Sequence, residues 1–120
     1  MQIHQSAEDY LETILMLTQR MGRVRSIDVV NELGFTKASV SIAMKKLREN
    51  GYIAVDGEGN LTLLEPGREI AERIYSRHRL LTHFFVQLGV DEEVAAEDAC
   101  KAEHILSEQT LKKILSLIHI

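Results

Sequence analysis

Three side chains that bind transition metals stand within five residues of one another near the end of the chain. Cys100, Glu103 and His104 occupy positions i, i+3 and i+4, which places all three side chains on one face of a helix. A thiolate, a carboxylate and an imidazole are all ligands of divalent transition metals. The Cys-x-x-Glu-His pattern therefore predicts a metal site on a helix that we expect over residues 91–106.

Further candidate ligands lie elsewhere in the chain. Asp9 and Glu12 are three residues apart on an expected first helix, 7–20, and His78 lies in the middle of a long expected helix, 67–88. If these helices meet the helix 91–106, six candidate ligands converge on one cation.

Each of these residues also has a simpler interpretation. His78 is flanked by two arginines and could be a surface residue, and a single intracellular cysteine is most often a small core residue. Asp9 and Glu12 resemble the acidic side chains common in the first turn of a helix. His83 and His119 have no comparably spaced partners, so we expect them to be packing or surface residues.

A second group of residues has the pattern of a DNA-reading element. Two short amphipathic helices are expected over residues 26–33 and 37–49, joined at Gly34 and Phe35, and the second would be the recognition helix of a helix-turn-helix. Short or flexible side chains at its start can reach base edges, and basic side chains on either side suit phosphate contacts. The candidate DNA-binding residues are Arg23, Arg25, Thr36, Lys37, Ala38, Ser39, Ser41, Lys45 and Lys46.

Residues 52–65 alternate between apolar and polar types around a strong turn sequence, Asp56 to Asn60, which predicts a β-hairpin. A helix-turn-helix followed by a hairpin is the winged-helix layout. The hairpin tip is acidic, so we expect it to contribute little to phosphate binding. The other interpretation is a helix-turn-helix that serves only protein contacts or packing.

These elements predict a mainly α protein with two parts. Residues 1–65 would form a winged helix-turn-helix DNA-binding domain, and residues 66–120 an all-helical metal-binding and dimerisation domain with helices over 67–88, 91–106 and 108–118. We expect Ser6, Ser26, Thr36 and Ser107 to cap the helices that follow them.

Charge is distributed unevenly along the 120 residues, although the net charge is −4. Residues 20–48 hold seven basic and two acidic side chains, a net charge of +5, whereas residues 91–108 hold one basic and seven acidic ones, a net charge of −6. The basic stretch coincides with the predicted recognition helix, which favours DNA binding over two merely solvated helix faces.

The remaining features limit the function classes. The chain has one cysteine, no apolar run long enough for a membrane span and acidic residues where a signal peptide would be apolar, so we expect a cytoplasmic protein without a membrane partner. It lacks a nucleophile elbow or a Gly-rich oxyanion turn, so we expect neither an enzyme nor a small organic substrate.

Four segments carry a resemblance to a known family. They are AEDYLETI, VVNELGFTKASVSIAMKKLRENGYI, LTLLEPGREIAERIYSRHRLL and GVDEEVAAEDACKAEHILSEQTL. Through them the chain resembles the iron- and manganese-dependent repressors, the DtxR/MntR family, in a short form without the SH3-like domain. The resemblance implies a homodimer that binds a double-stranded DNA operator and represses metal-uptake genes when metal is bound.

The resemblance also implies a ligand set. The manganese-type site matches Asp9, Glu12, His78, Glu103 and His104, whereas Cys100 is the iron-type feature in place of a glutamate. The iron-type second site would need a carboxylate at Thr82 and a histidine at Ala96, so we expect it to be absent or rebuilt.

We therefore expect a divalent metal, Fe(II) or Mn(II), to bind between the first helix, the long helix and the 91–106 helix and to fix the spacing of two recognition helices in a dimer. Zn(II), Co(II) or Ni(II) would also bind in vitro. Because the ligands must lose protons, metal affinity should fall in acid. The alternative is a winged-helix regulator without metal sensing that binds DNA constitutively or contacts other proteins.

Overall fold

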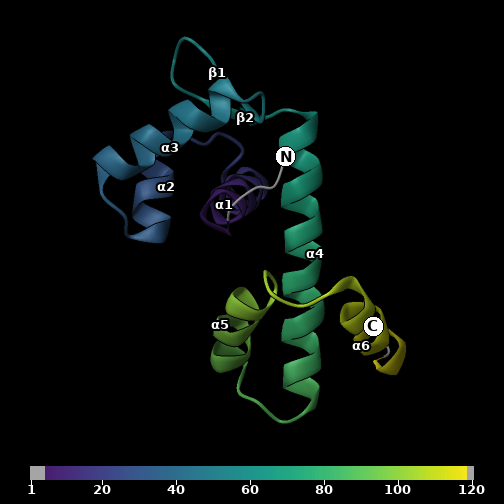
Figure 1. Ribbon diagram of the computed structural model, residues 1–120. Helices are drawn as coiled ribbons and strands as arrows, with labels where there is room; N and C mark the ends of the chain where they lie inside the picture. Colours follow the sequence, from purple (N-terminus) through teal and green to yellow (C-terminus); the bar gives the residue numbers. More distant parts are fainter. Residues whose placement is uncertain (1–4, 119–120) are drawn as a thin grey trace. The chain divides into compact units, whose positions relative to one another are not determined.

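The computed structural model describes residues 5–118 and shows a mainly helical chain with one small hairpin (Figure 1). The elements, in order, are α1 (Gln5–Met21), α2 (Ser26–Leu33), α3 (Lys37–Glu49), β1 (Ile53–Val55), β2 (Leu61–Leu63), α4 (Glu65–Gln87), α5 (Glu92–Ala102) and α6 (Glu108–Leu117). The predicted fold class, a winged helix-turn-helix followed by a helical region, is confirmed. Among residues 5–118, no helix is long and apolar enough to cross a membrane.

The chain divides into two compact units. Unit 1 ends at Glu72 and unit 2 begins at Arg73, so the division falls within α4. The functional boundary predicted at residue 65 stays a prediction.

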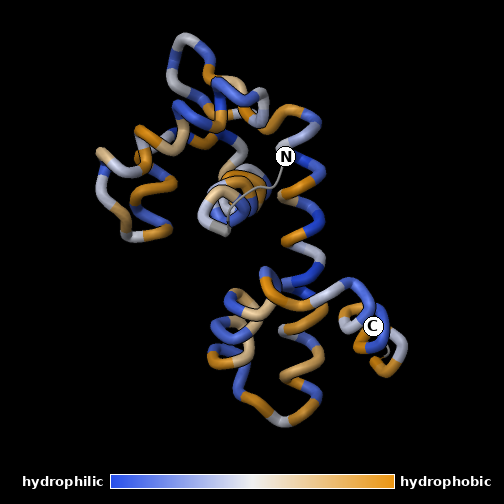
Figure 2. Tube along the Cα trace, in the orientation of Figure 1, coloured by the Kyte–Doolittle hydropathy of each residue, from blue (hydrophilic) through white to orange (hydrophobic). Residues whose placement is uncertain are grey.

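The core of unit 1 is built around α1, a helix that carries both hydrophobic and hydrophilic residues (Figure 2). Leu11 and Ile14 have no exposed surface and Leu17 is 2 % exposed. This face of α1 packs against α2, α3 and β2. Burial of several large aliphatic side chains, each contributing about 1.5–3 kcal/mol, holds the helix-turn-helix on its supporting helix.

The hairpin follows α3 directly. β1 and β2 are antiparallel, with Ile53 opposite Leu63 and Val55 opposite Leu61. The Leu61 amide donates a 2.7 Å hydrogen bond to the carbonyl of Val24, so the segment after α1 satisfies the outer edge of β2. The predicted wing is confirmed, with strands of three residues each.

Unit 2 has its own core. Leu81 of α4, Ala99 of α5 and Leu111 of α6 are buried together, and half-buried apolar residues such as Phe85 and Leu106 pack against them. This cluster fixes α5 against the second half of α4, where the candidate ligands of unit 2 lie.

Local signals predicted some helix ends and missed others. The bounds of α2 and α3 and the caps Thr36 and Ser107 are confirmed, each cap accepting a hydrogen bond from the amide three residues on. Two predicted caps are wrong: Ser6 lies inside α1, and Arg25 rather than Ser26 precedes α2. At the Arg25 position the Arg25 amide donates to the Asp28 carboxylate at 2.8 Å.

The helix predicted over 91–106 is also shorter than expected, because α5 ends at Ala102. Residues 103–106 continue as turns, with the amides of Ile105 and Leu106 both bonded to the Ala102 carbonyl. Glu103 keeps right-handed helical backbone angles, φ −59° and ψ −22°. The predicted i, i+3 relation of Cys100 and Glu103 therefore survives, whereas His104 lies in the turn.

Gly67 lies where the start of α4 passes the chain between α3 and β1. A Cβ added to Gly67 would stand 2.2 Å from the Tyr52 carbonyl oxygen, which already accepts a hydrogen bond from the Leu64 amide. We expect Gly67→Ala to destabilise the protein by about 1–3 kcal/mol, because backbone must move to make room.

Urea unfolding would measure this loss, and Gly57→Ala is the matched control. Gly57 has nothing within 4 Å of the added Cβ and no positive φ, so its replacement should be nearly neutral. Equal stability of the two variants would contradict the close approach at Gly67.

Candidate metal centre and DNA-binding surface

A fully buried carboxylate is the central feature of unit 2. Glu103 has 0 % exposed surface. Its Oε2 lies 3.1 Å from Nδ1 of His78, and its Oε1 lies 3.5 Å from Nε2 of His104, whose side chain is 2 % exposed. The structure thus brings three of the predicted ligands of unit 2 into direct contact.

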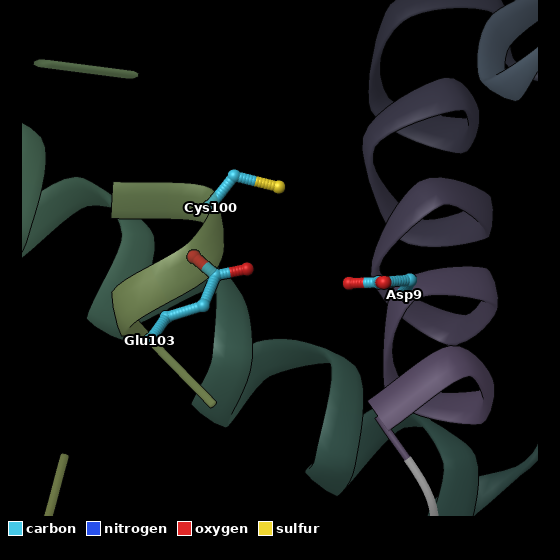
Figure 3. A group of neighbouring side chains, drawn as sticks. All are labelled: Asp9, Cys100 and Glu103. Carbon is cyan, nitrogen blue, oxygen red and sulfur yellow. The ribbon is translucent and has the colours of Figure 1, made fainter. Parts of the chain in front are cut away.

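Cys100 lies one turn before Glu103, and the two side chains project from the same side of the chain (Figure 3). The Cys100 sulfur and a Glu103 carboxylate oxygen are within 4.8 Å of each other. The residue is exposed. The alternative interpretation of Cys100 as a small core residue is therefore wrong, and the thiol is accessible beside the buried carboxylate.

Arg77 supports the turn that carries Glu103, although it was not among the predicted site residues. Its Nη1 donates to the Glu103 carbonyl oxygen at 3.3 Å, and its Nη2 lies 3.8 Å from the Glu108 carboxylate. In a longer α5 that carbonyl would accept from the amide of Ser107, so the guanidinium replaces a helix partner where α5 ends. No local sequence signal reveals this long-range contact.

The other two predicted ligands belong to unit 1. Asp9 and Glu12 lie on α1, Asp9 half-buried and Glu12 6 % exposed. Figure 3 shows the Asp9 carboxylate projecting from this helix. A carboxylate as buried as that of Glu12 is more than a solvated first-turn charge, because burial of an ionised group is costly without a compensating partner.

The donor set of unit 2 fits a divalent transition metal. Among residues 5–118, no hydrogen bond donor reaches Glu103 Oε1, although the atom is buried. An imidazole on each side and a thiol one turn away supply the remaining donor types. Thr82 and Ala96, which stand where an iron-type second site would have ligands, offer no carboxylate or imidazole, and the Thr82 hydroxyl donates to the His78 carbonyl at 2.7 Å.

The candidate DNA-binding residues are all exposed in unit 1. All nine are exposed, on α3 and on the segments before α2 and α3: Arg23, Arg25, Thr36, Lys37, Ala38, Ser39, Ser41, Lys45 and Lys46. The opposite face of α3 carries Val40, Met44 and Leu47, which are buried. The helix therefore presents a polar, basic side outward. The roles of individual residues stay predictions.

Thr36 fixes the start of α3. Its hydroxyl oxygen accepts from the Ser39 amide at 3.1 Å and lies 2.9 Å from the Ser39 hydroxyl, to which it donates. This cap holds the first turn, where a recognition helix places its base-reading side chains.

Ile42 was not among the predicted DNA-binding residues, yet it is 59 % exposed on α3. Its position two residues after the buried Val40 signals this in the sequence, because it falls on the opposite side of the helix.

The wing tip is organised by Asp56. Its carboxylate accepts hydrogen bonds from the Asn60 side chain and from the amides of Asn60 and Glu58, each at 2.9 Å. The Asn60 side chain, followed by the Asn60 amide, holds the pKa of Asp56 below its usual value. The tip is therefore a negatively charged turn, in keeping with the expectation of weak phosphate contact.

Comparison with known proteins assigns both halves of the chain to one family. Residues 2–61 match the family model for the iron dependent repressor N-terminal DNA binding domain, and residues 64–119 match the model for its metal binding and dimerisation domain. The chain belongs to the iron-dependent repressor family. The family assignment made from the sequence is confirmed, and an iron-dependent repressor is a metal-dependent DNA-binding regulator rather than a constitutive one.

Curated relatives extend over most of the chain. An uncharacterised helix-turn-helix transcriptional regulator of Methanocaldococcus jannaschii is 36 % identical over 112 residues, 92 % of this chain and 90 % of the relative. The transcriptional regulator MntR of Bacillus subtilis is 34 % identical over 113 residues, 94 % of this repressor and 80 % of the relative.

Solved structures share the fold. A manganese-dependent transcriptional repressor in complex with manganese superposes with a TM-score of 0.81 at 29 % identity, over 90 % of this chain and 50 % of that one. The IdeR protein of T. acidophilum has a TM-score of 0.82 at 22 % identity, over 97 % and 54 %. This repressor chain spans about half the length of both. The comparisons support a divalent metal as its cofactor.

The cap of α3 can be tested separately from the rest of the repressor. We expect Thr36→Ala to lower the free energy of unfolding by about 1 kcal/mol, because the Ser39 amide loses its acceptor. Hydrogen exchange at the Ser39 amide should become faster.

Ser107→Ala is the control, since Ser107 caps α6 in the same way, accepting from the Thr110 amide at 3.2 Å. It should cost a similar free energy and leave exchange at Ser39 unchanged. Unchanged Ser39 exchange in Thr36→Ala would contradict the assigned cap.

Proposed function

We propose that this protein represses metal-uptake genes in the cytoplasm by binding operator DNA as a homodimer when it holds Fe(II) or Mn(II). The observation that carries the proposal is the buried Glu103 carboxylate, which contacts His78 and His104 and has Cys100 one turn away. Burial of the Glu103 carboxylate beside two imidazoles has a cost that a bound cation would offset.

The proposed ligands come from both compact units. Unit 2 supplies His78, Cys100, Glu103 and His104, and unit 1 supplies Asp9 and Glu12 from the helix that supports the helix-turn-helix. When bound, the metal supplies a positive charge that these carboxylates and the thiolate share. An ion that takes ligands from both units couples the DNA-binding unit to the metal-binding unit, which is how metal would favour the DNA-competent state.

The proposed DNA contacts divide into two kinds. Lys45, Lys46, Arg23 and Arg25 contact phosphates, whereas the short side chains at the start of α3 lie at base edges. In a homodimer two copies of α3 would read half-sites about one helical turn apart. The dimerisation domain of the family supports two copies per operator.

The metal site predicts a specific loss of regulation. We expect Glu103→Gln and His104→Ala each to raise the Mn(II) concentration needed for DNA binding by about 100-fold or more, because direct ligands contribute at least as much as the residues that orient them. Fluorescence anisotropy of a labelled duplex from the region upstream of the protein's own gene, titrated with Mn(II), measures this.

Glu97→Gln is the matched control, because Glu97 is an exposed carboxylate on the same helix, α5. It should keep the wild-type Mn(II) dependence. DNA binding that survives chelation in the wild-type protein, or unchanged metal dependence in both ligand variants, would contradict metal sensing through this site.

The cysteine predicts how the site discriminates between metals. A thiolate suits Fe(II) or Co(II) better than Mn(II), which prefers carboxylates. We expect Cys100→Glu to lower the activating Mn(II) concentration relative to that of Co(II) by about tenfold, measured by the same anisotropy titration.

Co(II) also reports the ligand directly, since thiolate coordination produces a charge-transfer absorption band. The wild-type protein should show this band and Cys100→Ser should lose it while keeping its fold by circular dichroism. A band of equal intensity in Cys100→Ser would remove the thiolate from the ligand set.

A further inference from the structure

One large apolar side chain stands in the middle of the outward face of α3. Ile42 is 59 % exposed, although Val40, Met44 and Leu47 on the same helix are at most 5 % exposed. Because each residue advances the helix by about 100°, Ile42, two residues from both Val40 and Met44, lies about 160° around the helix from each of them. Its side chain therefore points almost directly away from the core of unit 1.

The surroundings of Ile42 match the surface of a DNA groove. Ala38 lies one turn before it and Lys45 and Lys46 lie one turn after it, all exposed. The first turn is anchored by the Thr36 cap. An apolar patch meant for a protein partner would be larger, whereas here one isoleucine is framed by short and basic side chains.

The apolar side chain of isoleucine limits which base it can recognise. Its side chain has no hydrogen bond donor or acceptor, so it cannot read the polar edge of a base. In the major groove the only apolar group presented by an unmodified base pair is the C5-methyl of thymine. The lysines that follow would hold phosphates and place α3 in the groove.

We propose that Ile42 is a specificity-determining residue that packs against a thymine methyl group in each operator half-site. The inference rests on the proposed docking of α3 in the major groove, and it adds the base that this helix prefers at its centre. Its side chain contributes through contact with the methyl carbon and excludes water from that step of the groove.

The test removes only the methyl group. The Mn(II)-loaded wild-type chain selects duplexes from a random-sequence pool, and each thymine of the enriched duplex is then replaced in turn by deoxyuridine. At one thymine per half-site we expect the wild-type affinity to fall about fourfold, the factor that corresponds to burial of one methyl group. Ile42→Ala should bind the thymine and uracil duplexes equally well at that position.

Two variants serve as controls, and a third repeats the test at Ile42. Ile27→Ala removes another exposed isoleucine, 43 % exposed on α2, and should keep both wild-type affinity and sensitivity to uracil. Lys45→Ala should weaken binding to all duplexes but keep the fourfold difference between thymine and uracil. Ile42→Gln should lose the methyl dependence in the same way as Ile42→Ala.

The outcomes separate the inference from the function beneath it. If no duplex is enriched, α3 is not a DNA reader and both the docking and the inference are wrong. If a duplex is enriched but no thymine methyl matters, or Ile42→Ala keeps the wild-type sensitivity, the assignment of Ile42 alone is overturned. Circular dichroism of Ile42→Ala is measured first, to establish that the variant keeps the wild-type helical content.

Discussion

The burial of the Glu103 carboxylate constrains the rest of unit 2. A carboxylate with no exposed surface must be compensated, because transfer of an isolated charge from water to a protein interior costs several kcal/mol or more. His78 and His104 stand at its two oxygens, and Arg77 binds the carbonyl of the same residue. The α5 helix ends just before this residue, and Arg77 donates to a carbonyl that a longer helix would pair with a backbone amide. The two imidazoles beside the Glu103 oxygens, those of His78 and His104, are also side chains that can hold a metal.

The recognition helix, α3, has to pack on unit 1 with one face and leave the other face exposed. Val40, Met44 and Leu47 fix α3 to unit 1, so its orientation on α1 is set by aliphatic packing rather than by polar contacts. Polar residues on the outward face are therefore available for a ligand. Ile42 is therefore unusual on α3, because it is a large apolar side chain on the exposed face and takes no part in the core.

Much of this could be predicted from the sequence because the signals are local. The Thr36 cap, the turn residues at Asp56 to Asn60 and the alternation of the hairpin each act over a few residues, and α2, α3 and the wing follow from them. The spacing of Cys100 and Glu103 likewise placed both on one side of the chain. The end of α5 could not be predicted, because the contact between Arg77 and Glu103 joins residues 26 positions apart. Ile42 was not among the predicted base-reading residues for another reason: that prediction rested on short or flexible side chains at the start of the helix, and isoleucine is neither.

The metal and the operator must affect each other equally if one protein binds both. Thermodynamic linkage requires that a metal which raises DNA affinity by a given factor is itself bound more tightly, by the same factor, on DNA. The proposed ligands on α1 belong to the helix that packs against α3. The same helix carries the buried core residues Leu11 and Ile14. Loss of a ligand on either unit would therefore weaken the coupling and not only the metal affinity. A protein that bound metal at unit 2 alone would show tight metal binding without an effect of DNA, so the dependence of metal affinity on DNA distinguishes a sensor from a protein that merely stores a cation.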